Sequence, residues 1–233
     1  MTEEAAQRAG LARQLSTESA SAQTRWNLLV LCVAMVVLVA TMLAARAELT
    51  SLEVGIFRAV NELPQGLHTV VWPFMQYGTF ITIPTLAVIA LLFRRSRLAL
   101  AMALAGVGVY LVALVVKDVV ERGRPGALLE AVEGRELFGA GSLGFPSGHG
   151  AVAAALTVVV AAHLSVRWVI VALALGAVVL FGRMYVGAHL PLDVVGGAAL
   201  GAVAGSVINL IVRPRPRPAD PYGPRLRGHS SAQ

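Results

Sequence analysis

The 233-residue chain is 57% hydrophobic and only 14% charged, with a mean hydropathy of +0.73, values that do not fit a soluble domain. Its formal net charge is +6 and its isoelectric point is about 10.4. Much of this charge lies in two terminal segments, the polar residues 1–25 and the Pro/Arg-rich residues 213–233. The basic composition therefore gives no indication of nucleic-acid binding and is typical of a membrane protein with basic ends next to its spans.

Charged residues divide the chain into six uncharged, apolar stretches: residues 26–45, 63–93, 98–116, 137–166, 168–182 and 194–212. Five of them are long enough to cross roughly 30 Å of hydrocarbon as a helix. The stretch 168–182 is shorter, but Arg167 and Arg183 at its ends can extend their side chains to the interface. We therefore expect an all-α integral membrane protein, a six-helix transmembrane bundle over residues 26–212, with disordered cytoplasmic tails at 1–25 and 213–233.

The first apolar stretch has a second interpretation. The letters "AARA" at residues 44–47 have the small-residue pattern of a signal-peptide cleavage site. The apolar region before them is longer than signal peptides usually have, which favours a retained span. The single cysteine, Cys32, lies inside this stretch and indicates no disulfide framework.

The distribution of arginines predicts the orientation, because cytoplasmic loops carry an excess of Lys and Arg. Arginines lie before the first stretch, at 94–97, at Arg167 and after the last stretch, all on one side of a six-span chain. Both termini are then cytoplasmic, and the loops 46–66, 117–148 and 183–190 face outward. The cations in those outward loops go against the usual bias and need a local reason.

The outward ends of the spans carry polar residues that suit a phosphate group: Lys117, Arg124, Ser147, His149, Arg183, His189 and Asp193. Lys and Arg supply charge and hydrogen-bond donors to non-bridging oxygens. In "PSGHG", Ser147 is predicted to cap a helix whose first amides, at Gly148 and His149, bind an anion. Asp193 follows His189 closely enough to orient that imidazole for attack or proton transfer.

Three segments carry a family resemblance. "KDVVERGRP", "PSGH" and "GRMYVGAHLPLD" resemble, in order and in spacing, the three signature motifs of the phosphatidic acid phosphatase type 2 superfamily, which includes undecaprenyl pyrophosphate phosphatases and vanadium haloperoxidases. The motifs span residues 117–193. Gly182 is the one departure, at a position where the family usually has serine.

The resemblance implies a lipid phosphatase of the membrane that needs no metal and no other cofactor. It implies that His189 attacks phosphorus to form a phosphohistidine, that Asp193 orients this histidine, and that His149 protonates the leaving group. The residues that it assigns to phosphate binding are Lys117, Arg124, Ser147, Gly148 through its amide, and Arg183.

The implied substrate is a lipid phosphate of the outer leaflet, and family analogy alone favours a polyprenyl pyrophosphate such as undecaprenyl pyrophosphate. Phosphatidylglycerophosphate, phosphatidate and sphingoid phosphates stay open as substrates. A phosphotransferase with a lipid or sugar acceptor and a catalytically silent lipid-binding or transport protein stay open as functions. The membrane layout argues against vanadium-dependent halide oxidation.

The remaining features have structural interpretations. Arg122 and Arg135 match no motif position and are predicted to be solvated or to face lipid headgroups, with contact to the substrate left open. Gly197, Gly201 and Gly205 recur at every fourth residue, which predicts close packing of the last span inside the bundle. The segment "ELTSLEVGIFRAVNELPQGL", between the first two spans, has apolar residues close to helical spacing, and we expect it to lie flat at the outer interface and to shape a lipid entrance.

Overall fold

A computed structural model describes residues 3–136 and 142–212 of the chain. Within these ranges the chain is helical apart from its connections and one isolated β-bridge between Gly123 and Leu143. The helices are α1 (Glu3–Ala45), α2 (Ser51–Asn61), α3 (His68–Met75), α4 (Thr82–Leu92), α5 (Ser96–Val120), α6 (Pro125–Leu128), α7 (Gly148–His163), α8 (Val166–Tyr185) and α9 (Pro191–Val212), and two 3-10 turns, η1 (Gln65–Leu67) and η2 (Gln76–Gly78), flank α3.

The helices of the described ranges include four that are long and apolar enough to cross a membrane: the Ala20–Ala45 part of α1, and α5, α8 and α9. The second predicted span is broken, because Gln65–Gly78 and Thr82–Leu92 meet at a bend of 68°. The fourth begins at Gly148, so α7 has only 16 residues. The described residues are thus those of an all-helical, multi-pass membrane protein with four candidate spans, or five if the bent pair is one span, and the prediction of six is not confirmed.

The break in the second span lies where η2 packs against the start of α7. A Cβ atom at Gly78 would lie 2.6 Å from the carbonyl oxygen of His149, so only glycine allows this approach. The hydroxyls of Thr79 and Thr82 both donate hydrogen bonds to the carbonyl of Gln76, at 2.7 and 2.6 Å, and so satisfy a carbonyl group at the break.

Residues 3–25 have a helical backbone that continues into the first span, whereas their composition predicted a disordered tail. They are rich in Ala, Glu, Gln and Arg, which are strong helix formers. The apolar helix that follows also removes the cost of nucleation. The predicted tail at 213–233 lies outside the described residues, and a separate compact unit begins at Trp26.

Helix α7 is central to this unit and contacts α5, α8 and α9. Its closest neighbour is α9, because the glycines at 197, 201 and 205 bring the two backbones together. A Cβ atom at Gly197 would collide with the carbonyl of Ser147, and one at Gly201 with the carbonyl of Ala151. The predicted packing of this glycine stripe inside the bundle is confirmed, and it places the first turns of α7 and α9 side by side.

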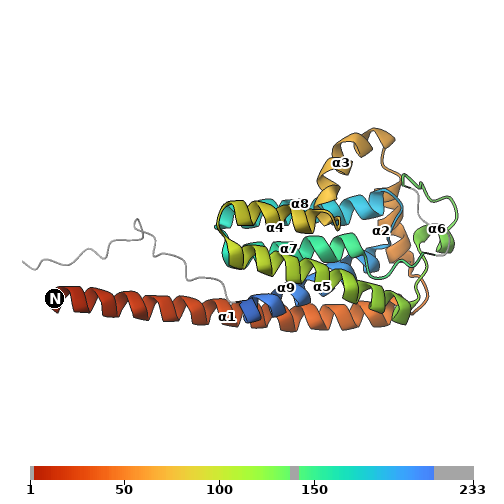
Figure 1. The fold of residues 1–233 in the computed structure, drawn as a ribbon. Helices are drawn as coiled ribbons and strands as arrows, with labels where there is room; N and C mark the ends of the chain where they lie inside the picture. Colours follow the sequence, from red (N-terminus) through yellow and green to blue (C-terminus); the bar gives the residue numbers. More distant parts are fainter. Residues whose placement is uncertain (1–2, 137–141, 213–233) are drawn as a thin grey trace, which may run out of the picture. The chain divides into compact units, whose positions relative to one another are not determined.

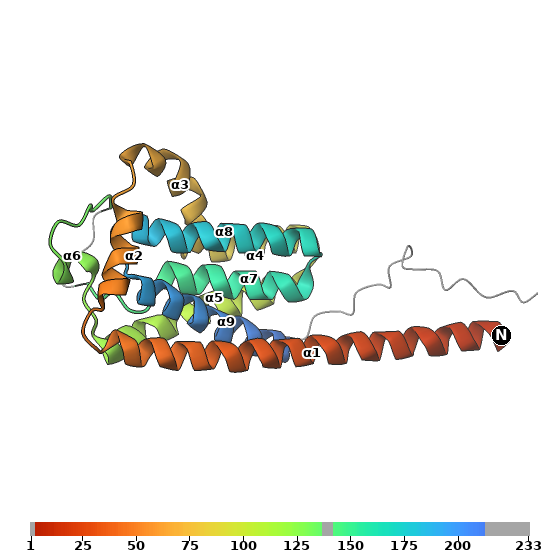
Figure 2. The ribbon, with the colours of Figure 1, turned by 180° about the vertical axis from the view of Figure 1, so that it is seen from behind.

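The two ends of the bundle differ. The short connections α4–α5 and α7–α8 lie at one end, and α2 and α6 lie at the other (Figures 1 and 2). Helix α2 is the helix predicted between the first two spans, and it runs across the ends of the longer helices (Figure 2). The loop after α5 and the starts of α7 and α9 lie at the α2 and α6 end, so the three sequence motifs meet there.

We expect Gly201→Ala to destabilise the protein, because the added methyl group must push α7 away from α9. Overpacking of this kind costs about 1–3 kcal/mol and should lower the midpoint of thermal unfolding in detergent. Gly108→Ala is the matched control, because a Cβ atom there meets nothing within 4 Å, and the replacement raises helix propensity by about 1 kcal/mol. Equal midpoints for the two variants would contradict the packing described for α9.

Candidate active site

The start of α7 has the predicted cap. Ser147 is completely buried, and its Oγ accepts a hydrogen bond from the Gly150 amide at 3.3 Å. The amides of Gly148 and His149 stand in the first turn, where a helix has no acceptors of its own for its N–H groups. The backbone of this turn can therefore bind an anion, whereas the Ser147 side chain is used to hold the turn.

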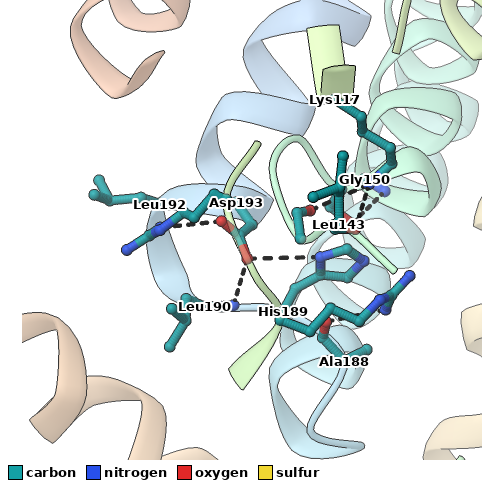
Figure 3. A network of polar contacts seen from close by, with 12 residues as sticks. Lys117, Leu143, Gly150, Ala188, His189, Leu190, Leu192 and Asp193 are labelled. Atoms are coloured by element: carbon teal, nitrogen blue, oxygen red, sulfur yellow. Dashed lines mark hydrogen bonds and ion pairs between the residues drawn. The ribbon is translucent and has the colours of Figure 1, made fainter. Parts of the chain in front are cut away.

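His189 lies just before α9, and Asp193 lies in the first turn of that helix. The carboxylate of Asp193 is fully buried, and its Oδ2 accepts a hydrogen bond from the Leu190 amide at 2.9 Å. The same oxygen lies 3.7 Å from Nδ1 of His189, and Figure 3 shows the ring beside the carboxylate. Nδ1 is buried and has no hydrogen-bond partner among the described residues, so Asp193 faces the ring at Nδ1, slightly beyond hydrogen-bond distance.

Hydrogen bonds between motifs join the three segments into one site. Lys117 Nζ donates to the carbonyls of Leu143 and Gly144, at 2.9 and 3.3 Å, just before the second motif (Figure 3). The Ser147 amide donates to the carbonyl of Asp193 at 2.9 Å, which connects the second motif to the third.

Arg124 connects the first motif to the third. Its Nη1 donates a hydrogen bond to the carbonyl of Ala188 at 3.1 Å. This bond connects the first motif to the residue next to His189. Segments far apart in the sequence are therefore held together by backbone and side-chain contacts.

Three cations surround His189. Its pKa lies well below the ordinary value of 6.5, first because the ring is buried and then because Arg183, Arg124 and Lys117 are close. The imidazole is therefore neutral at pH 7, which leaves a nitrogen lone pair available for attack. His149 also interacts electrostatically with Arg183, His189 and Arg124, so the second histidine belongs to the same cluster.

Arg183 is buried and pairs with Glu136, because Nη1 of Arg183 donates to Oε2 of Glu136 at 2.7 Å. A carboxylate therefore contacts one of the guanidinium groups assigned to phosphate binding. Sequence reasoning did not identify this contact, because Glu136 belongs to no motif. The fold explains the contact, because the amide of the preceding residue, Arg135, donates to the carbonyl of Val186 just after α8 and so brings Glu136 next to Arg183.

Arg122 is not solvated as predicted, because only 6% of its surface is exposed. Its Nη1 donates to Glu53 Oε1 at 3.0 Å, and its Nη2 donates to Glu53 Oε2 at 2.7 Å. Nη1 also donates to Asp193 Oδ1 at 3.0 Å. Burial lowers the pKa of Arg122, but the two carboxylates outweigh this and raise it. The sequence feature that could have indicated this buried ion pair is Glu53, because it lies on the same face of α2 as Phe57 and Asn61, which are also buried.

Arg135 is also not solvated, and here the partners are backbone carbonyls. Its guanidinium donates to the carbonyls of Asn61 at 2.7 Å, Leu63 at 2.8 Å and Tyr185 at 2.5 Å. The same group lies 4.2 Å from the centre of the Tyr185 ring. Arg135 therefore joins α2 to the end of α8. Its described hydrogen bonds go to backbone carbonyls and not to His189 or Asp193.

Gly182, the departure from the family pattern, has a packing reason. A Cβ atom at this position would lie 2.7 Å from the sulfur of Met75 and 3.0 Å from a methyl group of Val71, both on α3. Helix α3 therefore packs directly on the backbone of α8, next to Arg183. A serine hydroxyl has no room in this arrangement unless Met75 moves.

A family model described as PAP2 superfamily matches residues 96–217, more than half of the chain. The chain belongs to the PAP2 superfamily. This confirms the family suggested by the three motifs, all of which lie inside the matched range. A search of curated proteins finds no match.

Two solved structures of the superfamily have a similar fold. LpxE of Aquifex aeolicus is 24% identical, with a TM-score of 0.63 over 68% of this chain and 95% of that one. A transmembrane PAP2 type phosphatidylglycerolphosphate phosphatase from Bacillus subtilis is 23% identical, with a TM-score of 0.64 over 77% of this chain and 94% of that one. The helical arrangement around the motifs is thus a known one.

The lowered pKa of His189 predicts a pH dependence of stability. Below about pH 6.5 the unfolded chain binds a proton at this residue and the folded chain does not, so stability is lost as the pH falls, at up to about 1.4 kcal/mol per unit. Replacing the residue by His189→Gln should therefore reduce the fall in the midpoint of thermal unfolding between about pH 7.5 and about pH 5.5. An identical fall in the variant and in the wild type would show that the ring is protonated in the folded protein.

Proposed function

We propose that the protein is a membrane lipid phosphatase that hydrolyses a phosphomonoester or pyrophosphate on a lipid through a phosphohistidine. The observation that carries the proposal is the state of His189: buried, neutral, facing Asp193 through Nδ1 and surrounded by Lys117, Arg124 and Arg183. A neutral imidazole among three cations suits attack on a phosphate. Membership of the PAP2 superfamily supports the same conclusion.

In the first step, His189 Nε2 forms a bond to phosphorus while the bond from phosphorus to the leaving oxygen breaks. His149 gives its proton to that oxygen, and Asp193 accepts a hydrogen bond from Nδ1–H of the imidazole, which keeps this proton as positive charge develops on the ring. The negative charge of the incoming phosphate favours the protonated form of His149 that this step needs. Arg183 exchanges the carboxylate of Glu136 for a phosphate oxygen.

In the second step, a water molecule attacks phosphorus and the bond to His189 breaks. His149, now neutral, takes the proton of the water, so it returns to the state in which it started. Inorganic phosphate leaves, and His189 is again neutral. Lys117, Arg124, Arg183 and the amides at the start of α7 stabilise the charge on the transferred group in both steps.

The site is proposed to face the outside of the cell membrane, with both termini in the cytoplasm. Arg94, Arg95, Arg97 and Arg167 lie at the α4–α5 and α7–α8 connections, the end of the bundle opposite to the site (Figure 1). Cytoplasmic ends carry such an excess of arginine. The bent α3–α4 segment and the short α7 then each cross the membrane, and the cations of the outer end are there to bind phosphate.

Polyprenyl pyrophosphate is the substrate that we favour, by analogy within the family. A lipid substrate is supported by the exposed apolar residues Leu52 and Ile56 on α2, which lies at the site end of the bundle. Acyl or prenyl chains can contact this surface while the headgroup reaches the cations. The chain of the lipid and the number of its phosphates are decided by contacts beyond the phosphate cluster.

The first test is phosphate release by the purified protein in detergent with EDTA, from polyprenyl pyrophosphate, phosphatidylglycerophosphate and phosphatidate. We expect release that resists EDTA and falls at least about a thousandfold in His189→Ala, because this variant lacks the imidazole that forms the phosphohistidine. His163→Ala, at the other end of α7, is the control and should keep full activity.

Other outcomes of this test have distinct meanings. Equal activity of His189→Ala and the wild type would overturn the mechanism, and loss of release in EDTA would overturn metal independence. Release that requires an added lipid or sugar alcohol would identify a phosphotransferase. No turnover of any lipid, with or without acceptor, would point to a lipid-binding or transport protein.

Asp193→Asn should fold and keep weak activity. The amide has no negative charge to balance positive charge on the ring, and its single oxygen can accept from only one of Arg122 and the Leu190 amide, so one of these two donors then faces the NH2 group. We expect kcat to fall by about a hundredfold or more, with KM nearly unchanged, in steady-state assays on the best lipid of the panel. A variant with wild-type kcat would remove Asp193 from the mechanism.

A further inference from the structure

A buried group of three charges stands behind the His189–Asp193 pair, and the reaction described above does not use two of its members. Arg122 lies between Glu53 of α2 and Asp193 of α9, and all three side chains are at most 6% exposed. Glu53 also accepts a hydrogen bond from the Leu192 amide, at 3.2 Å. The group therefore connects α2, the loop after α5 and the first turn of α9.

We propose that Glu53 and Arg122 are positioning residues for the reaction, which hold the Asp193 carboxylate toward His189 and preserve its negative charge. This inference rests on the proposed roles of His189 and Asp193. The described side-chain hydrogen bonds of Glu53 and Arg122 go to each other, to Asp193 and to the Leu192 amide, so the two residues act on the reaction through Asp193 and the turn that carries it.

The geometric part of the argument concerns the two oxygens of Asp193. Oδ1 accepts from Arg122 at 3.0 Å, and Oδ2 accepts from the Leu190 amide at 2.9 Å while facing His189. These two bonds fix both oxygens, so the carboxylate cannot rotate away from the ring. Without Arg122 only one oxygen is held, and a displacement of about 1 Å at such a contact can slow a reaction about a hundredfold.

The electrostatic part of the argument concerns Glu53. An arginine that paired only with Asp193 would neutralise it and make it a weaker acceptor for the imidazole. Glu53 binds the same guanidinium through both of its oxygens, at 3.0 and 2.7 Å, so the group as a whole keeps one negative charge. That charge balances the positive charge that develops on His189 during attack.

Stability alone does not explain this group. Removing three charges from water is expensive, and apolar residues of similar volume often serve stability as well or better. The attachment of α2 to the bundle does not require it either, because Arg135 already joins Asn61 and Leu63, at the end of α2, to Tyr185 of α8 through backbone carbonyls.

The test is the double variant Glu53→Gln/Arg122→Met, assayed as full-length protein in detergent on the best lipid of the panel. Gln keeps an acceptor for the Leu192 amide, and Met fills the volume of the arginine stem. We expect a folded protein whose kcat is lower by about a hundredfold, with KM within about threefold of the wild type. Wild-type kcat in the folded double variant would overturn the proposal.

Arg135→Met is the matched control, because it removes a half-buried arginine from the same connection between α5 and α7, and the described hydrogen bonds of Arg135 do not involve Asp193. It should lower the midpoint of thermal unfolding and leave kcat within about threefold of the wild type. An equal fall of kcat in this control would also overturn the proposal, since any loosening of the loop would then slow the reaction.

Glu53→Gln alone decides the question if the double variant does not fold. It is isosteric and keeps one hydrogen bond to Arg122, and we expect kcat to fall by about tenfold without a matching change in KM. An unchanged kcat overturns the proposal. Failure of the underlying function looks different, because the wild type and His189→Ala would then release phosphate equally or not at all.

Discussion

The buried carboxylate of Asp193 is the point on which the site depends. A charge removed from water must be satisfied by protein groups, and this one takes its partners from separate segments: Arg122 after α5 and the Leu190 amide before α9. Its own carbonyl accepts from the Ser147 amide at the start of α7. Satisfying one residue therefore brings together the ends of three helices, and the two histidines are carried on two of these segments.

Glycines make this convergence possible, because the partners of Asp193 can approach only if backbones do so as well. A Cβ atom at Gly144 would lie 2.8 Å from the carbonyl of Gly123 and 3.0 Å from Asp193 Oδ2. Gly197, one turn further along α9, touches the carbonyl of Ser147 in the same way. The loop before α7 is thus pressed against the end of α5 and the start of α9.

The cations of the site repel one another, and nearby carbonyl and carboxylate groups reduce this repulsion. Lys117, Arg124 and Arg183 repel one another in a region of low dielectric constant. Backbone carbonyls accept from Lys117 and Arg124, and the carboxylate of Glu136 pairs with Arg183. The same repulsion makes the cluster attractive to a phosphate, because an anion removes it. In the proposed function, a position at one end of the bundle lets a lipid headgroup reach these charges while its hydrocarbon stays in the membrane.

Motif spacing was sufficient to predict the family. It also predicted two local contacts, because His189 and Asp193 lie within one helical turn of each other and Ser147 caps the helix that it begins. Local geometry decides such contacts, and the same holds for the glycine stripe of α9. The pair of Glu53 and Arg122 lies 69 residues apart and could not be found in this way. Hydropathy also does not register a bend, so the break at Gly78 and the short α7 were missed. Only tertiary structure decides which distant charges are buried together, because burial makes a partner obligatory and the fold determines which partner is within reach.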